Sequence, residues 1–244
     1  MRALVIGEGR HDVGSRDPDA SEGRDGAPGW SQAILELLRD TAIPLTRTHV
    51  PFARMLPLPS NSRKFQPYPK GPAFNALRAK VYADLNKVDF DILIFITDAD
   101  TPDNREWHDV YAAIEEAMTR VGSPMPHVVC VPKSMSESWL LADSEAWRRA
   151  GLEDLGQLPK DPEECWGDDH RPDTSDRPKH LFNRLGKQAH DLCGSGTERR
   201  YRIAATSDPR MLLEKCPLSF RAFWKRLHDV GIAIPPPDDP MRRR

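Results

Sequence analysis

The feature that most constrains the fold is a run of apolar residues at 92–97 that leads directly into two aspartates, Asp98 and Asp100. The run is rich in β-branched side chains, which is typical of a central strand covered on both faces. Three further short apolar runs, at residues 3–7, 45–50 and 128–131, have the length and composition of buried strands. The sequence therefore predicts a sheet of about four strands.

Helical patterns lie between these strands. Apolar residues recur three or four positions apart over residues 74–88 and 107–121, and a shorter pattern covers residues 34–38. Asp103 or Asn104 could cap the second of these helices. Strands that alternate with helices predict an α/β fold with a mostly parallel sheet flanked by helices, and an α+β arrangement with hairpins is the alternative.

Composition divides the rest of the chain. We predict an α/β domain at residues 1–150, an acidic, proline-rich loop at 151–178, a helical extension packed on the core at 179–234 and a frayed tail at 235–244. Within the extension, helices are expected at residues 179–190, 208–215 and 219–230. Loops are expected at residues 14–29 and, as a stiff basic connector, at 51–72.

Charge and cysteine content exclude several classes of protein. The 39% of apolar residues can build a core, and the net charge of -2 argues against a nucleic-acid binder that acts through bulk positive charge. No apolar stretch is long enough to span a membrane, and the four cysteines contain no C-x-x-C pair. We therefore expect a reduced cytoplasmic protein without a membrane segment or a structural zinc.

Carboxylates stand where two of the predicted strands end. Glu8 follows the first strand between two glycines, and Asp98 and Asp100 follow the third. Parallel strands end at one edge of a sheet, where α/β proteins bind ligands, so the three acids are expected to face one crevice. A divalent cation would remove their mutual repulsion, and oxygen ligands suit Mg²⁺ or Mn²⁺. His11 and Asp12 could provide a further metal ligand or a general base. The alternative for each acid at a strand end is that it is an ordinary residue of a turn.

Two short motifs resemble a known domain. Val5-Ile6-Gly7-Glu8-Gly9, followed about ninety residues later by Thr97-Asp98-Ala99-Asp100, resembles the Toprim domain of topoisomerases, primases and overcoming-lysogenization-defect nucleases. The rest of the chain resembles a bacterial Toprim-related family of unknown function that is often encoded beside an ATPase in defence loci. The stretches that suggest this second resemblance are residues 136–143, Pro178-Lys179, Ile203-Ala204 and residues 216–220.

The resemblance implies a Mg²⁺-dependent nuclease, or a related phosphoryl-transfer enzyme, that acts on nucleic acid as a defence effector. Glu8 would be a metal ligand or general base, and Asp98 and Asp100 would hold the metal. Glu137 or Asp143 could complete a second metal position, whereas an acid at a helix N-terminus is the alternative for Glu137.

Basic residues elsewhere are candidate contacts to nucleic acid. Aromatic residues interleave with them in two segments, so bases could stack beside the phosphate contacts. Solvated surface is the alternative for such runs. The candidates are Lys133, Arg63, Lys64, Lys70, Arg199 and Arg200.

Two other functions stay open on the sequence alone. A haloacid-dehalogenase phosphatase also uses an Asp-x-Asp, but its motif normally follows the first strand. A non-catalytic partner or sensor subunit of the neighbouring ATPase would fit the near-neutral charge and the long proline-rich loops. A homo-oligomer is compatible with either function.

Overall fold

The computed structural model describes residues 1–14, 28–55, 57–58 and 64–237. Its centre is a sheet of four parallel strands in the order β2-β1-β3-β4, which confirms the predicted α/β fold. Each strand lies within one residue of the range predicted for it. The strands are β1 (Arg2–Gly7), β2 (Thr46–Pro51), β3 (Ile92–Ile96) and β4 (His127–Cys130).

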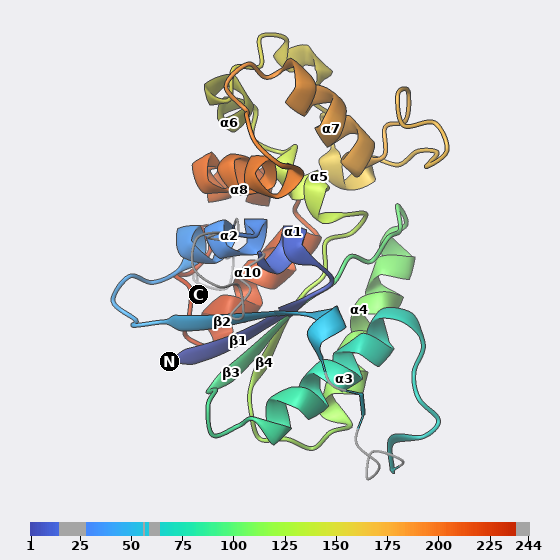
Figure 1. Cartoon of the computed structure of the whole chain (residues 1–244), viewed down its shortest axis with the longest axis vertical. Helices are drawn as coiled ribbons and strands as arrows, with labels where there is room; N and C mark the ends of the chain where they lie inside the picture. Colours follow the sequence, from blue (N-terminus) through green and yellow to red (C-terminus); the bar gives the residue numbers. More distant parts are fainter. Residues whose placement is uncertain (15–27, 56, 59–63, 238–244) are drawn as a thin grey trace, which may run out of the picture.

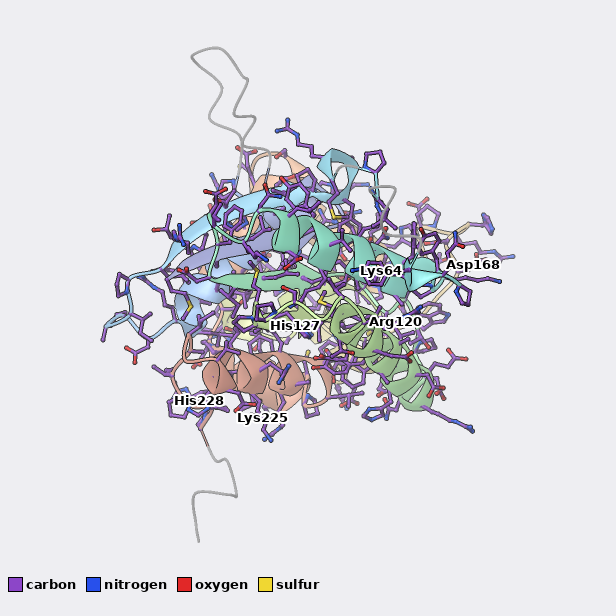
Figure 2. The ribbon with its side chains drawn as sticks, turned by 90° about the horizontal axis from the view of Figure 1, so that it is seen from below. Lys64, Arg120, His127, Asp168, Lys225 and His228 are labelled. Carbon is purple, nitrogen blue, oxygen red and sulfur yellow. The ribbon has the colours of Figure 1, made fainter. Side chains whose placement is uncertain are left out.

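Helices cover both faces of this sheet (Figure 1). On one face lie α3 (Gly71–Leu85) and α4 (Asn104–Thr119), and on the other lie α1 (Arg10–Val13), α2 (Trp30–Leu38) and α10 (Ser219–Asp229). Asp103 caps α4 by accepting a hydrogen bond from the backbone N–H of Glu106. Seen from below, α4 and α10 lie next to each other at the edge formed by β4 (Figure 2).

Alternate residues of the strands enter two separate hydrophobic cores. Leu93 and Phe95 of β3 pack on the side of α3 and α4, whereas Ile94 and Ile96 pack on the side of α2 and α10. All five residues of β3 are buried, as expected of a central strand whose side chains point alternately to both faces.

A further group of helices stacks beyond α1 and α2, on the side away from the sheet (Figure 1). Its members are α5 (Ser136–Leu140), α6 (Ser144–Arg149), α7 (Pro178–Gln188), α8 (Gly196–Thr206) and α9 (Pro209–Lys215). Helix α8 packs against α2. Trp139 of α5 is fully buried, and its ring contacts those of Trp30, Phe220 and Phe223. One core therefore joins the early, middle and late parts of the chain.

Two details of the fold differ from the prediction. The apolar pattern of residues 74–88 extends past the helix, because α3 ends at Leu85, and Leu85 and Val88 are 61% and 77% exposed. The acidic loop is more than a surface connector. Glu163 is buried, and its carboxylate accepts hydrogen bonds from the backbone N–H groups of Leu218 (3.1 Å) and Ser219 (2.8 Å) at the start of α10.

Every helix in the described part of the chain is too short or too polar to cross a lipid bilayer. Most of the loop predicted at residues 14–29, together with Arg63, lies outside the described residues.

Candidate active site

Glu8 and Asp98 follow two adjacent central strands, at the point where the sheet order changes direction. β1 and β3 are parallel neighbours, and β1 also pairs with β2 on its other side. The Thr97 hydroxyl, one residue before Asp98, donates a hydrogen bond of 2.6 Å to Glu8 Oε1. The structure thus brings these two predicted site residues to the same carboxyl edge, where ligands bind in folds of this type.

Asp98 lies in a strongly acidic environment. Its Oδ1 accepts a hydrogen bond of 2.9 Å from the backbone N–H of Ser136. Burial raises the pKa of Asp98 well above its ordinary value, and the negative charges of Asp12, Glu137 and Glu8 raise it further. We refer to Glu8, Asp12, Asp98 and Glu137 as the acidic cluster.

Asp12 anchors the short helix that follows Glu8. Its carboxylate accepts hydrogen bonds from the indole N–H of Trp30 (2.8 Å) and the backbone N–H of Gly9 (3.1 Å). Burial is the main cause that raises the pKa of Asp12 to about 6, and the charges of Glu8 and Glu137 add to it. Asp12 therefore combines a structural role in joining α1 to α2 with membership of the acidic cluster.

The raised pKa of Asp12 predicts how stability depends on pH. Its carboxyl holds a proton in the folded chain up to about pH 6 but loses it near pH 4 when unfolded, so its contribution to stability is lost as the pH rises through this window. In urea unfolding of the metal-free protein, a rise from pH 4 to pH 6 should change the free energy of unfolding less favourably for the wild type than for Asp12→Asn. Equal slopes would contradict the assignment.

Glu137 is paired with a buried arginine. Arg200 of α8 donates from Nε to Glu137 Oε1 at 2.9 Å, its guanidinium lies over the Phe182 ring at 5.1 Å, and both charged residues are no more than 5% exposed. Arg200 is therefore not available as the surface contact to nucleic acid that the sequence suggests. The same helix contacts His11, whose Nδ1 is 2.7 Å from the Thr197 hydroxyl.

Asp100 points to a different partner from Asp98. Its backbone is left-handed, with φ of 55°, which interrupts the extended conformation that would have aligned the two aspartates. Arg177 donates to Asp100 Oδ1 and, at 2.5 Å, to Asp169, and its guanidinium lies over the Trp166 ring. The acidic loop thus supplies a cation to one of the three predicted ligands.

Asp143 serves as a helix cap. One carboxylate oxygen accepts from the backbone N–H of Glu145 in α6, and the other accepts from the backbone N–H of Asp208, which precedes α9. Both distances are short, at 2.9 and 2.8 Å, and the side chain is buried. These bonds account for an acid at this position without a metal.

The predicted basic contacts lie in different environments. Lys133 is fully buried, and its ammonium donates to Glu164 Oε1 at 2.6 Å. Lys64 and Lys70 are exposed near the start of α3. Arg199 is half-buried and donates from Nε to the Gly194 carbonyl.

The side-chain oxygens of the acidic cluster are of the chemical type that Mg²⁺ prefers as ligands. They are hard carboxylate oxygens, and the pKa of Asp98 is raised first by burial and then by neighbouring carboxylates, so a bound cation would stabilise its charged form. Among the described residues, no three histidine, cysteine, aspartate or glutamate side chains are grouped closely enough to enclose a metal ion. Mg²⁺ keeps several of its waters and often binds through one or two carboxylates, a number that Glu8 and Asp98 could supply.

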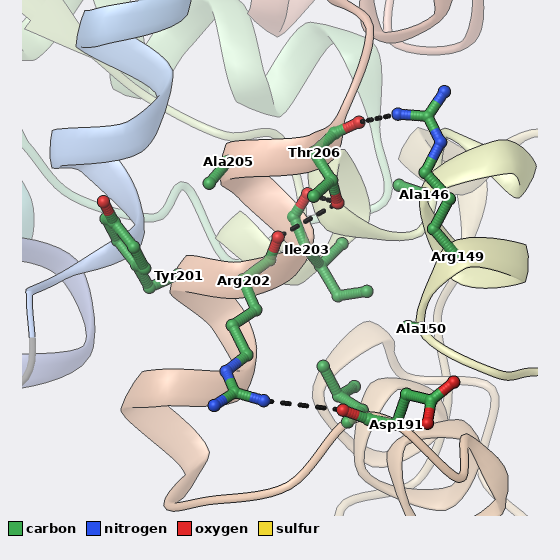
Figure 3. A pocket seen from close by; sticks show the side chains of 10 residues that line it. Ala146, Arg149, Ala150, Asp191, Tyr201, Arg202, Ile203, Ala205 and Thr206 are labelled. Atoms are coloured by element: carbon green, nitrogen blue, oxygen red, sulfur yellow. Dashed lines mark hydrogen bonds between the residues drawn. The ribbon is translucent and has the colours of Figure 1, made fainter.

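A separate hollow of 250 Å³ lies between α6 and α8 (Figure 3). Arg149 donates to the Thr206 carbonyl and Arg202 donates to the Asp191 carbonyl at its margin. None of the predicted metal ligands lines this hollow, so it is distinct from the acidic cluster.

Fold and site together define a class: a parallel α/β protein with two carboxylates, Glu8 and Asp98, at the carboxyl ends of its two central strands. Comparison of the chain with models of known protein families, with curated proteins and with solved structures finds no match.

Proposed function

We propose that this chain is a Mg²⁺- or Mn²⁺-dependent nuclease, or a related phosphoryl-transfer enzyme, that acts on nucleic acid. The observation that carries the proposal is that Glu8 and Asp98 follow adjacent central strands, with the hydroxyl of Thr97, the residue before Asp98, bonded to Glu8. The motif order that resembles a Toprim domain agrees with this chemistry. A role as a defence effector rests on that resemblance.

The chain's own residues would hold the two acids in place before substrate arrives. Thr97 engages Oε1 of Glu8, and Oε2 would bind the ion or take a proton from the attacking water. The Ser136 N–H orients Asp98 as a ligand. A bound Mg²⁺ would stabilise the charge that develops on the phosphate oxygens and help to activate water. Asp100 would join this site by exchanging Arg177 for the metal or by using its second oxygen.

The test is an assay of purified protein on labelled single- and double-stranded DNA and RNA, with Mg²⁺, with Mn²⁺ and with EDTA. Cleavage is expected only with metal, and Glu8→Gln should reduce it to the EDTA level because it removes a charged oxygen ligand. Glu153→Gln is a matched control, since the Glu153 side chain is 88% exposed. Cleavage that survives in both Glu8→Gln and Asp98→Ala would contradict the proposal.

A second candidate is a non-catalytic partner or sensor subunit of an ATPase encoded nearby. The observation that favours it is that arginines neutralise two of the predicted acids, Asp100 through Arg177 and Glu137 through Arg200. This function predicts stable co-purification with the ATPase and no metal-dependent cleavage by the isolated chain. Enzyme-like cleavage by the isolated chain would exclude it.

A further inference from the structure

A groove runs between α4 and α10 at the edge of the sheet beyond β4. Its volume is 520 Å³, within the range of small-ligand sites. Trp107 and Tyr111 of α4 line one side, and their rings lie 5.1 Å apart between centroids. The Trp107 indole N–H donates to the Val131 carbonyl, which fixes this wall to the carboxyl end of β4. The groove therefore has an aromatic wall that begins at the edge where the acidic cluster lies.

The opposite wall is cationic. Arg221, Lys225 and Arg226 of α10 line it, and Arg221 and Lys225 are exposed four residues apart, on the same side of the helix. Figure 2 shows Lys225 on the surface of α10. Arg226 forms an ion pair with Glu115, with 3.5 Å between the charged atoms. Asp229 contributes a negative charge to the lining of the groove. The groove thus carries more positive than negative charge although the whole chain has a net charge of -2.

We propose that the α4–α10 groove binds single-stranded nucleic acid. Cations on one wall would contact the phosphates, and the half-buried ring of Tyr111 on the other would stack with a base that a duplex keeps paired, while the buried Trp107 ring supports it from behind. This combination distinguishes a single strand from an acidic protein segment, which offers charge but no bases to stack. The inference rests on the proposed function, since it gives the nuclease a path that leads a strand towards Glu8 and Asp98.

The test measures binding without cleavage. Fluorescence anisotropy of labelled oligothymidine, in EDTA, is compared for the wild type and for Arg221→Glu/Lys225→Glu. The double variant should bind at least about tenfold more weakly, with a reduced dependence on salt, because two phosphate contacts are lost. Lys87→Glu/Lys187→Glu is the matched control, since it reverses two exposed charges elsewhere and should bind like the wild type.

Oligothymidine binding that is equal in the double variant and the control would overturn the inference. Tighter binding of polyglutamate than of oligothymidine would also overturn it and would favour an acidic protein partner. The proposed function is judged separately, by cleavage with Mg²⁺ or Mn²⁺. Groove-dependent binding without cleavage would support the inference and contradict the nuclease. Cleavage at an equal rate by the wild type and the groove variant would support the nuclease and contradict the inference.

Discussion

Asp98→Asn is expected to abolish most metal-dependent cleavage and, at neutral pH, to make the metal-free protein more stable. The pKa of Asp98 is raised in the folded chain, so ionisation costs more there than in the unfolded chain. Stability is therefore lost as the pH rises from the ordinary aspartate range through this raised pKa. Asparagine removes that cost, and its Oδ1 can still accept from the Ser136 N–H.

The expected sizes are a loss of about 10³-fold in cleavage rate and a gain of a few degrees in melting temperature. Mg²⁺ should raise the melting temperature of the wild type more than that of the variant, because only the wild type keeps the charge that attracts the ion. Asp98→Ala is the control for the hydrogen bond, since it removes the acceptor for Ser136. A lower melting temperature for Asp98→Asn at neutral pH would contradict this account.

Arg200→Ala is expected to destabilise the fold by about 3–5 kcal/mol, because it leaves the Glu137 carboxylate buried without its counter-charge. Urea denaturation of the metal-free protein measures this loss. Combining Arg200→Met with Glu137→Gln should recover much of it, since no buried charge is then left unpaired. Arg199→Ala is a matched control on the same helix, because Arg199 is only half-buried and bonds a backbone carbonyl.

A loss for Arg200→Ala no larger than that for Arg199→Ala would contradict the role of the ion pair. An equal loss in the double variant Arg200→Met/Glu137→Gln would show that packing against Phe182, rather than charge balance, is what Arg200 contributes.

The strands could be predicted closely because buried parallel strands need uninterrupted apolar residues, and residues 92–97 show this clearly. Their order along the chain also predicted that Glu8 and Asp98 lie at the same edge of the sheet, since parallel strands in α/β units end at one edge. The positions of the strands follow from local apolar patterns, and their shared edge follows from the order of strands and helices. Both can be read from the sequence.

Other features depend on partners far along the chain. The sequence pattern does not predict α8, because charged residues interrupt its apolar face, and only the capping box of Ser195 and Glu198 marks its start. The burial of Arg200 follows from Glu137, 63 residues earlier. Asp100 likewise takes Arg177 as its partner across 77 residues, a pairing that the Asp-x-Asp spacing does not reveal.

The shared aromatic core has a consequence for how such a chain can evolve. The Trp139 ring contacts both Trp30 and Phe220, although these residues belong to the start, middle and end of the sequence. Recombination that exchanged everything after residue 150 would join surfaces that had not changed together, and the hybrid would expose large unpaired rings to water. We therefore expect exchange of the segment after residue 150 to destabilise the fold more than point substitutions on the surface do.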